Sequence, residues 1–580
     1  MGRTVEARWE LLSTDADLEL MSRVLGIKEV TAAVIANRGI RSKNAAIAYL
    51  RGLPGHHAKT LDMKDAKKAF DRIIMGIQQR ERIMIYGDYD ADGVMSTVIL
   101  YKSLKICGAD VHFYIPNREE EGYGLNIDAV RAIKEADYDL LITCDNGIAA
   151  LMEIAEAQAL GMDVIVIDHH EPGFVEESEG IKHDVIPEAI AVIDPKQTDC
   201  SYPFKEMCAG GLAFKLMEAF YSYTARDFSL VHDELLVLAA IATVCDIVDL
   251  KGENRALVKQ GLEVINANKS INGGLGQLIA LKGYMDKPID TFTIGFVLGP
   301  CINATGRLES AEMSVRMLIS TNVEEQMSLA ETLSGLNEER KSLTRRCTDK
   351  ILEKAASVQD TVLVLVDEET HESIAGIVAG RVKETLYRPA IVLTRGSEAG
   401  ILKGSGRSIE GYNMFEALYA CKELFLRFGG HAMAAGMSLE ENSVRELRRR
   451  LNEDCTLQES DLQSIIHIDR ELAPNDITLE LAKELEWLAP FGKGNHEPLF
   501  VTRGLSITAL RVINEKNTLI FTFGTGSSGG TLKGIAFGLN DIFSGDIGNI
   551  MDVVHTVETN TYNGRTSVQM RIKDFKLRKV

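Results

Sequence analysis

The chain has 580 residues, of which 45% are hydrophobic and 26% are charged. This balance is that of folded globular proteins and excludes a largely disordered chain. A formal net charge of −20 argues against a protein that coats nucleic acid through its overall field, although a local groove of Arg and Lys can still bind a nucleic-acid substrate.

The length predicts about three to four domains. Residues 1–6 carry no apolar signal core, and no apolar run approaches the roughly 18 residues that span a bilayer. A cytoplasmic protein without a membrane partner is therefore expected. Nine cysteines occur without CxxC pairs, so neither a structural zinc site nor a disulfide framework is predicted.

Helical spacing dominates the first part of the chain. Apolar residues recur at helical intervals from Leu25 to Ile35 and from Ala66 to Ile77, which predicts an amino-terminal helical cap over residues 1–80. From residue 81 to about 250, apolar runs of strand length alternate with amphipathic stretches. That alternation indicates βαβ units on a parallel sheet, and we assign residues 81–307 to this domain.

The rest of the chain predicts three further parts. Residues 308–357 contain no Pro and, apart from Gly335, no Gly, which predicts long connecting helices. A second α/β domain is expected over residues 358–455. Residues 456–580 contain short strands separated by turn signals, which is typical of a small OB-fold barrel that binds nucleic acid. The expected fold class is α/β, with two lobes joined by helices and a C-terminal OB-like β-barrel.

Four short apolar runs are each followed by acidic or imidazole groups. We interpret the runs as strands, because strands that end in carboxylates place them at the edge where open α/β sheets bind ligands. Carboxylates with imidazoles suit Mn²⁺ or Mg²⁺, and two such ions roughly 3.5–4 Å apart promote displacement at phosphorus. The runs precede Gly87–Gly93, Asp145-Asn146-Gly147, Asp168-His169-His170 and Asp246.

The first and third of these clusters differ in how specific they are. Asp88, Asp90 and Asp92 alternate, so in an extended segment they would point to one side. A solvated acidic turn or a calcium loop would show the same letters, but no Glu follows at the calcium-loop distance and a strand precedes. In Asp168-His169-His170, neighbouring side chains diverge, so one imidazole can bind metal while the next faces substrate. An isolated histidine pair is more often structural.

Two glycine-rich runs mark the second lobe. They are Lys403–Ser408 and Phe428–His431. Glycine lets the backbone approach a phosphate, and Arg407 could supply a bidentate fork. A run of the first kind is more often a simple tight turn. The chain has no GxxxxGK[ST] motif, so ATP-driven translocation is not indicated.

Taken in order, these motifs resemble those of the DHH phosphoesterase superfamily. The second lobe resembles its DHHA1 domain, through Gly376–Arg381, Gly404–Ser408 and Gly429-Gly430-His431. Within the superfamily the chain is similar to the bacterial RecJ exonucleases, which degrade single-stranded DNA from its 5′ end. Further signatures support this similarity: Ile115–Arg118, Gly122–Leu125, Asn303–Arg307 and Pro490–Asn495.

The resemblance implies roles for particular residues. The implied metal ligands are Asp90, Asp92, Asp145, His169 and Asp246, with Asp145 as the bridge between two Mn²⁺ ions, for which Mg²⁺ can substitute. The implied catalytic residues are Asp88, His170 and Arg307. The implied substrate-binding residues are Arg381, Ser405, Arg407, Ser408, Gly430 and His431.

The resemblance also implies an activity and partners. The expected reaction is metal-dependent 5′ to 3′ hydrolysis of single-stranded DNA to nucleoside 5′-monophosphates, in DNA repair and recombination. Single-stranded DNA is the expected partner of a monomer, alongside a RecQ-type helicase and a single-strand-binding protein. Cys301 departs from the family pattern, since it stands where Arg is common.

Two other functions remain open at this point. A DHH enzyme for oligoribonucleotides, pAp or cyclic dinucleotides would have two domains, which the amino-terminal cap and the barrel disfavour. A non-catalytic replication scaffold of the same fold is disfavoured by the intact acidic set.

Overall fold

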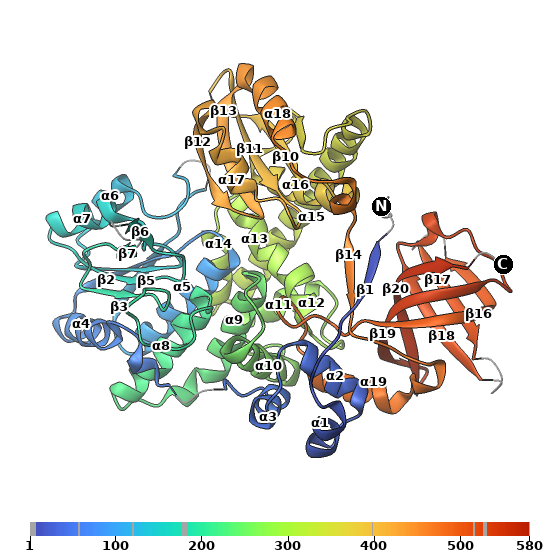
Figure 1. Ribbon diagram of the computed structural model, residues 1–580. Coiled ribbons are helices and arrows are strands. Elements are labelled where there is room, and N and C mark those ends of the chain that lie inside the picture. Colours follow the sequence, from blue (N-terminus) through green and yellow to red (C-terminus); the bar gives the residue numbers. More distant parts are fainter. Residues whose placement is uncertain are drawn as a thin grey trace. The chain divides into compact units, whose positions relative to one another are not determined.

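The computed structural model describes residues 7–55, 58–118, 121–176, 182–396, 398–513, 517–525 and 530–578. The chain divides into two compact units (Figure 1). Residues Ile47–Glu338 and Ala489–His496 form the first, and Met1–Ala46, Glu339–Leu488 and Glu497–Val580 form the second. Within the described residues, no helix has the length and apolar character needed to cross a bilayer.

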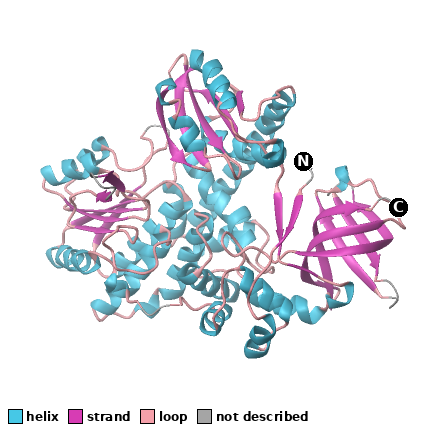
Figure 2. Cartoon of the chain, viewed as in Figure 1, coloured by secondary structure: helices cyan, strands magenta, loops and turns pink. Residues whose placement is uncertain are grey.

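The unit that contains residues 47–338 is built on a parallel sheet with the strand order β3-β2-β4-β5-β8. The strands are β2 (Arg82–Tyr86), β3 (Asp110–Tyr114), β4 (Leu140–Cys144), β5 (Asp163–Ile167) and β8 (Ala191–Ile193). Ile83 and Ile85 enter one core, and Met84 and Tyr86 enter the other. Because helices cover both faces (Figure 2), the central strands β2, β4 and β5 are mostly apolar and buried after their first residues.

Helices surround this sheet and extend beyond it. Those of the first half are α3 (Lys43–Arg51), α4 (Ala66–Gln79), α5 (Ala91–Ile106), α6 (Ile127–Glu135), α7 (Leu151–Ala159) and α8 (Ala209–Tyr223). Those that follow are α9 (His232–Cys245), α10 (Gly252–Ala267), α11 (Gly273–Leu281), α12 (Thr291–Thr293), α13 (Gly299–Leu308) and α14 (Glu312–Ile319). A π-helical turn, η3 (Ile294–Leu298), joins α12 to α13, and a hairpin is formed by β6 (Gly173–Glu176) and β7 (Lys182–Val185).

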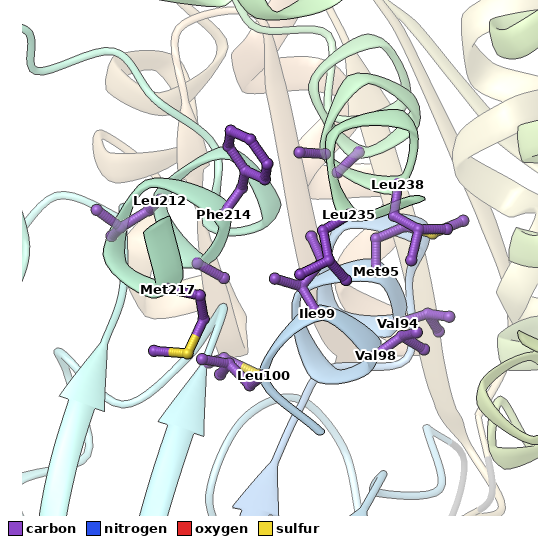
Figure 3. Packing of buried hydrophobic residues seen from close by; sticks show 14 of the residues in the cluster. Val94, Met95, Val98, Ile99, Leu100, Leu212, Phe214, Met217, Leu235 and Leu238 are labelled. Carbon is purple, nitrogen blue, oxygen red and sulfur yellow. The ribbon is translucent and has the colours of Figure 1, made fainter. Parts of the chain in front are cut away.

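Three of these helices share one apolar core. Figure 3 shows Met95 and Ile99 of α5 packed with Leu238 of α9, and Leu212 of α8 belongs to the same buried cluster. α5 begins beside the Asp88–Asp92 loop, and α9 ends at Asp246. This core therefore sets the positions of two sequence-distant acids. The long helix α15 (Val323–Ala356) then leads into the second unit, as the fold prediction requires.

The second unit contains a mixed sheet with the order β12-β13-β11-β10-β9. Its strands are β9 (Leu363–Val366), β10 (Ala390–Arg395), β11 (Ile401–Arg407), β12 (Phe425–His431) and β13 (Ala434–Glu440), and its helices are α16 (Glu372–Leu386), α17 (Met414–Tyr419) and α18 (Val444–Glu453). Val364 and Leu365 enter different cores on the two faces. The glycine-rich run Lys403–Ser408 lies largely in strand β11 and does not form the tight turn that is the common alternative. The run Phe428–His431 lies in strand β12.

The same unit contains a closed barrel. Its strands are β16 (Phe500–Ile513), β17 (Thr518–Gly524), β18 (Thr531–Phe537), β19 (Ile550–Tyr562) and β20 (Arg565–Leu577), and β19 pairs with both β20 and β16 to close it. Short elements precede it: β14 (Ile465–Ile468), β15 (Arg470–Glu471) and α19 (Leu479–Leu485). The predicted α/β fold class with a C-terminal barrel is confirmed.

The amino-terminal part differs from the helical stretch that periodicity predicts. Besides α1 (Leu18–Leu25) and α2 (Glu29–Asn37), it contains the strand β1 (Arg8–Leu11), which pairs in parallel with β14. The Trp9 indole donates a hydrogen bond of 2.8 Å to Asp574 and lies 4.8 Å from the Lys576 ammonium. Long-range contacts of this kind hold the four residues of β1, whose sequence shows no helical apolar periodicity. The assignment of residues 1–80 to one domain stays a prediction.

We predict that Leu238→Ala destabilises the first unit. Leu238 is fully buried, and removing a buried leucine side chain costs about 2–5 kcal/mol. The midpoint of thermal unfolding, measured by calorimetry on the full chain, should fall. Leu230→Ala is the control, because this leucine lies before the other end of α9 and is 76% exposed, so its loss should change stability by less than about 0.5 kcal/mol. Equal effects of the two substitutions would contradict the packing.

Candidate metal centre

The loop between β2 and α5 holds Asp88 and Asp90, and Asp92 follows at the start of α5. Asp90 caps α5, and its carboxylate accepts backbone hydrogen bonds from Asp92 at 2.9 Å and Gly93 at 3.1 Å. Asp92 lies in the first helical turn, so the expected alternation along an extended segment is wrong. Aspartate is a strong helix cap and is favoured at the positive end of the helix dipole. A Cβ on Gly93 would lie 2.5 Å from the Asp88 carbonyl oxygen, which explains glycine there.

Asp145 follows β4 and is almost fully buried. Its backbone has a φ of +65°, a left-handed conformation that aspartate tolerates better than most residues. The next side chain, Asn146, donates to the carbonyl of Cys144 at 3.0 Å. The turn therefore holds the Asp145 carboxylate at the carboxyl edge of the sheet.

The Asp168-His169-His170 run follows β5, and its two imidazoles have different partners. His169 Nε2 lies 3.0 Å from Asp145 Oδ1 and 3.5 Å from Asp92 Oδ2. His170 Nδ1 lies 2.7 Å from Asp168 Oδ1, and this side chain is 45% exposed. Asp168 also accepts backbone hydrogen bonds from His169 and from Ile148. His169 thus faces Asp92 and Asp145, and His170 is oriented by the Asp168 carboxylate.

Asp246 reaches the cluster from a helix. The apolar run before it, predicted as a strand, lies in α9, and Asp246 is the residue that follows the helix. A short apolar run cannot distinguish a buried strand from a helix that is buried all round. The Asp246 carboxylate lies 3.9 Å from His169 Nδ1. Asp92 is held from another side, because the backbone N–H groups of Ala209 and Gly210, at the start of α8, donate to it at 2.8 and 2.7 Å.

These side chains form three overlapping sets of ligand atoms. Within each set the ligand atoms lie within 4.8 Å of one another. The sets are Asp88, Asp90 and Asp145; Asp92, His169 and Asp246; and Asp145, His169 and His170. Asp145 belongs to two sets and His169 to two, so the arrangement suits two neighbouring cations with a shared ligand. Carboxylate oxygens with an imidazole nitrogen match the preferences of hard divalent ions.

The carboxylates raise one another's pKa. Burial, together with the charge of Asp90, raises the pKa of Asp92 to about 7. Burial and the charge of Asp92 raise the pKa of Asp246 to about 8. The pKa values of Asp88 and Asp145 are raised for the same reasons. A buried Asp88 oxygen also has no hydrogen-bond partner among the described residues. A bound cation would supply the positive charge that the carboxylates lack and a partner for the Asp88 oxygen.

The two imidazoles have opposite protonation. Burial and the charge of His170 lower the pKa of His169 to about 3, so His169 is neutral and has a lone pair for a metal ion. Burial alone would lower the pKa of His170, but its hydrogen bond and charge interaction with Asp168 outweigh burial and raise it to about 9. His170 is therefore a cation at neutral pH.

Arg307 lies in the same unit as the acids, on α13. The Asn303 side chain of this helix accepts a hydrogen bond of 2.7 Å from Ala91 N. A Cβ on Gly306 would lie 2.4 Å from the carbonyl oxygen of Tyr89. Arg307 also lowers the pKa of Tyr89 through its charge, though burial raises it overall. The helix thus packs directly on the acidic loop. Cys301, on the same helix, is buried, and its sulfur lies 3.4 Å from Asn337 Nδ2.

Two residues absent from the predicted site contribute to it. The Tyr123 hydroxyl donates to the Asp145 carbonyl oxygen at 3.1 Å and lies 3.2 Å from His170 Nε2. Asp168 orients His170, as described above. Both lie in segments that the sequence analysis singled out, but a letter pattern does not tell which member of a segment turns toward the acids.

The predicted substrate-binding residues belong to the second unit, whereas the acids belong to the first. Strand register places Arg407, Ala434 and His431 in one row across β11, β13 and β12. The neighbouring row on the same face contains Ser405, Gly436 and Gly429. A Cβ on either of these glycines would meet no atom within 4 Å. A shallow open strip is therefore flanked by the side chains of Ser405, Arg407 and His431.

The other three predicted residues of this group have different surroundings. Arg381 is exposed on α16, and Gly430, in β12, is exposed with a φ of +148°. The buried Ser408 hydroxyl donates to the Tyr412 carbonyl oxygen at 2.7 Å, so it supports the turn after β11. Burial lowers the pKa of Arg407, whose guanidinium bonds to the Gly406 carbonyl oxygen.

Comparison with known proteins assigns the family. The chain matches the models of the DHH family, N-terminal domain over residues 82–243, the DHHA1 domain over 359–456 and the RecJ OB domain over 468–574. It is 38% identical over 574 residues to the single-stranded-DNA-specific exonuclease RecJ of Bacillus subtilis, covering 98% of this chain and 70% of that protein. The chain belongs to the RecJ family.

Two further relatives agree. RecJ of Escherichia coli is 33% identical over 560 residues, covering 93% of this chain and 94% of that protein. The crystal structure of RecJ from Thermus thermophilus in complex with Mn²⁺ superposes with a TM-score of 0.82 at 29% identity, covering 99% of this chain and 80% of the other. The likeness thus extends over almost the whole chain.

We predict that the metal-free protein loses stability as the pH rises from about 5 to about 8. The folded pKa values of Asp92, about 7, and of Asp246, about 8, exceed the unfolded value of about 3.9. The folded state therefore binds more protons than the unfolded state in this range, and stability falls with pH. A divalent cation replaces these protons, so its stabilising effect should grow over the same interval.

The measurement is the thermal unfolding midpoint of chelator-treated protein across this pH range, with and without MnCl₂. Asp246→Asn removes one of the titrating groups, so its midpoint should fall less steeply than that of the parent. A parent midpoint that falls no more steeply than that of the variant would contradict the coupled acidic cluster.

Proposed function

We propose that this chain is a metal-dependent exonuclease that hydrolyses the phosphodiester bonds of single-stranded DNA. The observation that carries the proposal is the set of carboxylates gathered around His169, with ligand atoms within 4.8 Å, in a chain of the RecJ family. The proposed metal ligands are Asp90, Asp92, Asp145, His169 and Asp246. Mn²⁺ is the proposed ion, with Mg²⁺ as a substitute, since solved RecJ structures hold each.

The chain's own groups have definite tasks in this reaction. Bound divalent ions supply Lewis acidity and a water of lowered pKa. Asp145 would help to hold both ions through its carboxylate oxygens, and its position is fixed by the turn after β4. Cationic His170 faces the scissile phosphate and stabilises the charge that develops there, while Asp168 holds its ring. Tyr123, whose hydroxyl lies 3.2 Å from His170 Nε2, fixes the imidazole from its other side.

Asp88 and Arg307 complete the catalytic set. Asp88 lies in one of the sets of ligand atoms, with Asp90 and Asp145, so its carboxylate would orient groups next to the proposed ligands. Arg307 offers a guanidinium for the phosphate next to the acidic loop. Both roles follow from their placement around the Asp88–Asp92 loop.

We further propose that the second unit holds the 5′ end of the strand. Ser405, Arg407 and His431 border the open strip over Gly429 and Gly436, where a phosphate can approach the backbone. Arg381, Ser408 and Gly430 complete the proposed substrate-binding group. Holding this end would produce 5′ to 3′ degradation and release nucleoside 5′-monophosphates.

The proposed setting is DNA repair and recombination in the cytoplasm. The barrel gives the chain a third nucleic-acid-binding part, which disfavours a two-domain enzyme for short oligonucleotides. A monomer that works with a RecQ-type helicase and a single-strand-binding protein is the proposed arrangement.

We predict that Asp92→Asn abolishes most activity on single-stranded DNA. The change removes a charged ligand, so the rate should fall by at least about 100-fold, the upper range for losing an outer-shell partner of a metal. The assay follows 5′- and 3′-labelled single-stranded and duplex DNA with Mn²⁺. Asp128→Asn is the control, since Asp128 is exposed on α6 of the same unit. Equal activity of parent and Asp92→Asn would refute the site, and a preference for blunt duplex would refute the substrate.

We predict that Arg407→Lys weakens recognition of a 5′ phosphate. Lysine keeps the charge but loses the two parallel hydrogen bonds, and a charge-assisted hydrogen bond contributes about 1.5–3 kcal/mol. KM for a 5′-phosphorylated strand should rise about tenfold or more, with a smaller rise for a 5′-hydroxyl strand. Arg395→Lys is the control on the neighbouring strand β10, where the side chain is 71% exposed. An unchanged ratio of the two KM values would rule out the assignment.

A further inference from the structure

Ile247 has a backbone conformation that isoleucine rarely adopts. It follows Asp246 directly, with a φ of +58°, and it is 64% exposed. For a β-branched residue this left-handed conformation is unfavourable, and an exposed apolar side chain offers no compensating burial. Glycine or asparagine would take the same conformation with less strain. The side chain is therefore better explained by what it contacts in a complex than by the fold.

An exposed pair of aromatic rings lies on the helical segment before α13. Phe292 and Phe296 are 59% and 67% exposed, and their rings are stacked with centroids 4.8 Å apart at an interplanar angle of 22°. Phe296 lies in the π-helical turn η3, a distortion that is frequent at functional sites. Two large apolar rings that face water beside each other form a flat surface that the fold does not bury.

Both features lie at the same end of α9. A Cβ on Gly295, in η3, would lie 3.7 Å from Val244, and one on Gly299 would lie 2.3 Å from the Cys245 sulfur. Val244 and Cys245 are the last residues before Asp246. The segment that carries the rings therefore packs against the helix end that carries the acid.

Positive charge lies close to this apolar surface. Lys251 Nζ is 2.9 Å from Asp249, and Lys493 Nζ is 3.9 Å from the same carboxylate, while both lysine side chains are about 60% exposed. Leu250 N donates to the Lys493 carbonyl oxygen at 2.8 Å. Thr291, next to Phe292, donates to the carbonyl oxygen of Phe491 at 2.6 Å. The ammonium groups and the rings thus belong to one neighbourhood of the first unit.

We propose that Ile247, Phe292 and Phe296 form a stacking surface for the unpaired bases of the strand that enters the metal centre, with Lys251 and Lys493 beside its phosphates. This inference rests on the proposed function. Aromatic rings interleaved with cations are how proteins hold single strands without reading their sequence. Bases paired within a duplex do not offer their faces, so the surface contributes to selection of single strands at the site of cleavage.

The test compares a natural single strand with an abasic strand of the same length, which keeps the phosphates and lacks the bases. Affinity is measured by fluorescence anisotropy with Ca²⁺ in place of Mn²⁺. For Phe296→Ala, the affinity for the natural strand should fall roughly 5- to 100-fold, the range for losing one stacking ring. The affinity for the abasic strand should match that of the parent. Phe296→Trp should restore binding of the natural strand.

A second variant separates binding from folding. Ile247→Gly relieves the backbone strain, so its unfolding midpoint should equal or exceed that of the parent, while its affinity for the natural strand falls. Leu230→Ala, an exposed apolar truncation before the opposite end of α9, should leave both affinities unchanged.

Two outcomes would overturn the inference. One is an unchanged affinity of Phe296→Ala for the natural strand, as expected if the rings instead contact a partner protein. The other is an equal loss for natural and abasic strands, which would assign the effect to the backbone. Failure of the proposed function is distinguishable, because it would appear as a parent protein that does not degrade single-stranded DNA with Mn²⁺.

Discussion

The repulsion among buried carboxylates is the constraint around which the first unit is organised. Asp88, Asp90, Asp92, Asp145 and Asp246 meet at one sheet edge, where a low dielectric strengthens like-charge repulsion. Part of the charge is balanced by the protein. Asp90 lies at the positive end of α5, and the first N–H groups of α8 donate to Asp92. The charge that remains would favour binding of divalent cations, as proposed above.

This balance requires close packing between elements that are distant in sequence. A Cβ on Gly210 would lie 2.4 Å from the Ala242 Cβ and 3.1 Å from the Asp92 carboxylate, so α8 can approach both α9 and Asp92 only with glycine at that position. The apolar core of α5, α8 and α9 supplies the free energy that holds these helix ends together. Packing of these helices therefore positions the proposed metal ligands Asp92 and Asp246, in addition to the strand ends that position Asp145 and His169.

The sequence predicted the strand-borne part of this site better than the helix-borne part. Apolar runs before Asp145 and Asp168 have strand length, and parallel strands end at one edge, so their meeting follows from the pattern. Asp246 was predicted at that edge for the wrong reason, because a helix buried on all sides lacks the polar face that reveals it. The role of Tyr123 depends on one hydrogen bond and one ring orientation, which residue spacing does not encode. Likewise, only strand register reveals that Arg407 and His431 share a row.

The short segment Ala489–His496 has a consequence for how this protein can be divided. It belongs to the first unit, although the chain on both sides of it belongs to the second. Asn495 accepts a hydrogen bond from the Tyr49 hydroxyl and donates to the Pro490 carbonyl oxygen, so the segment is part of the fold of the unit that holds the acids. A truncation before residue 489 would remove the barrel and a structural piece of the catalytic unit together. A boundary that spares the first unit therefore lies after His496, and recombination between relatives that exchanged the barrel together with residues 489–496 would also replace part of the first unit.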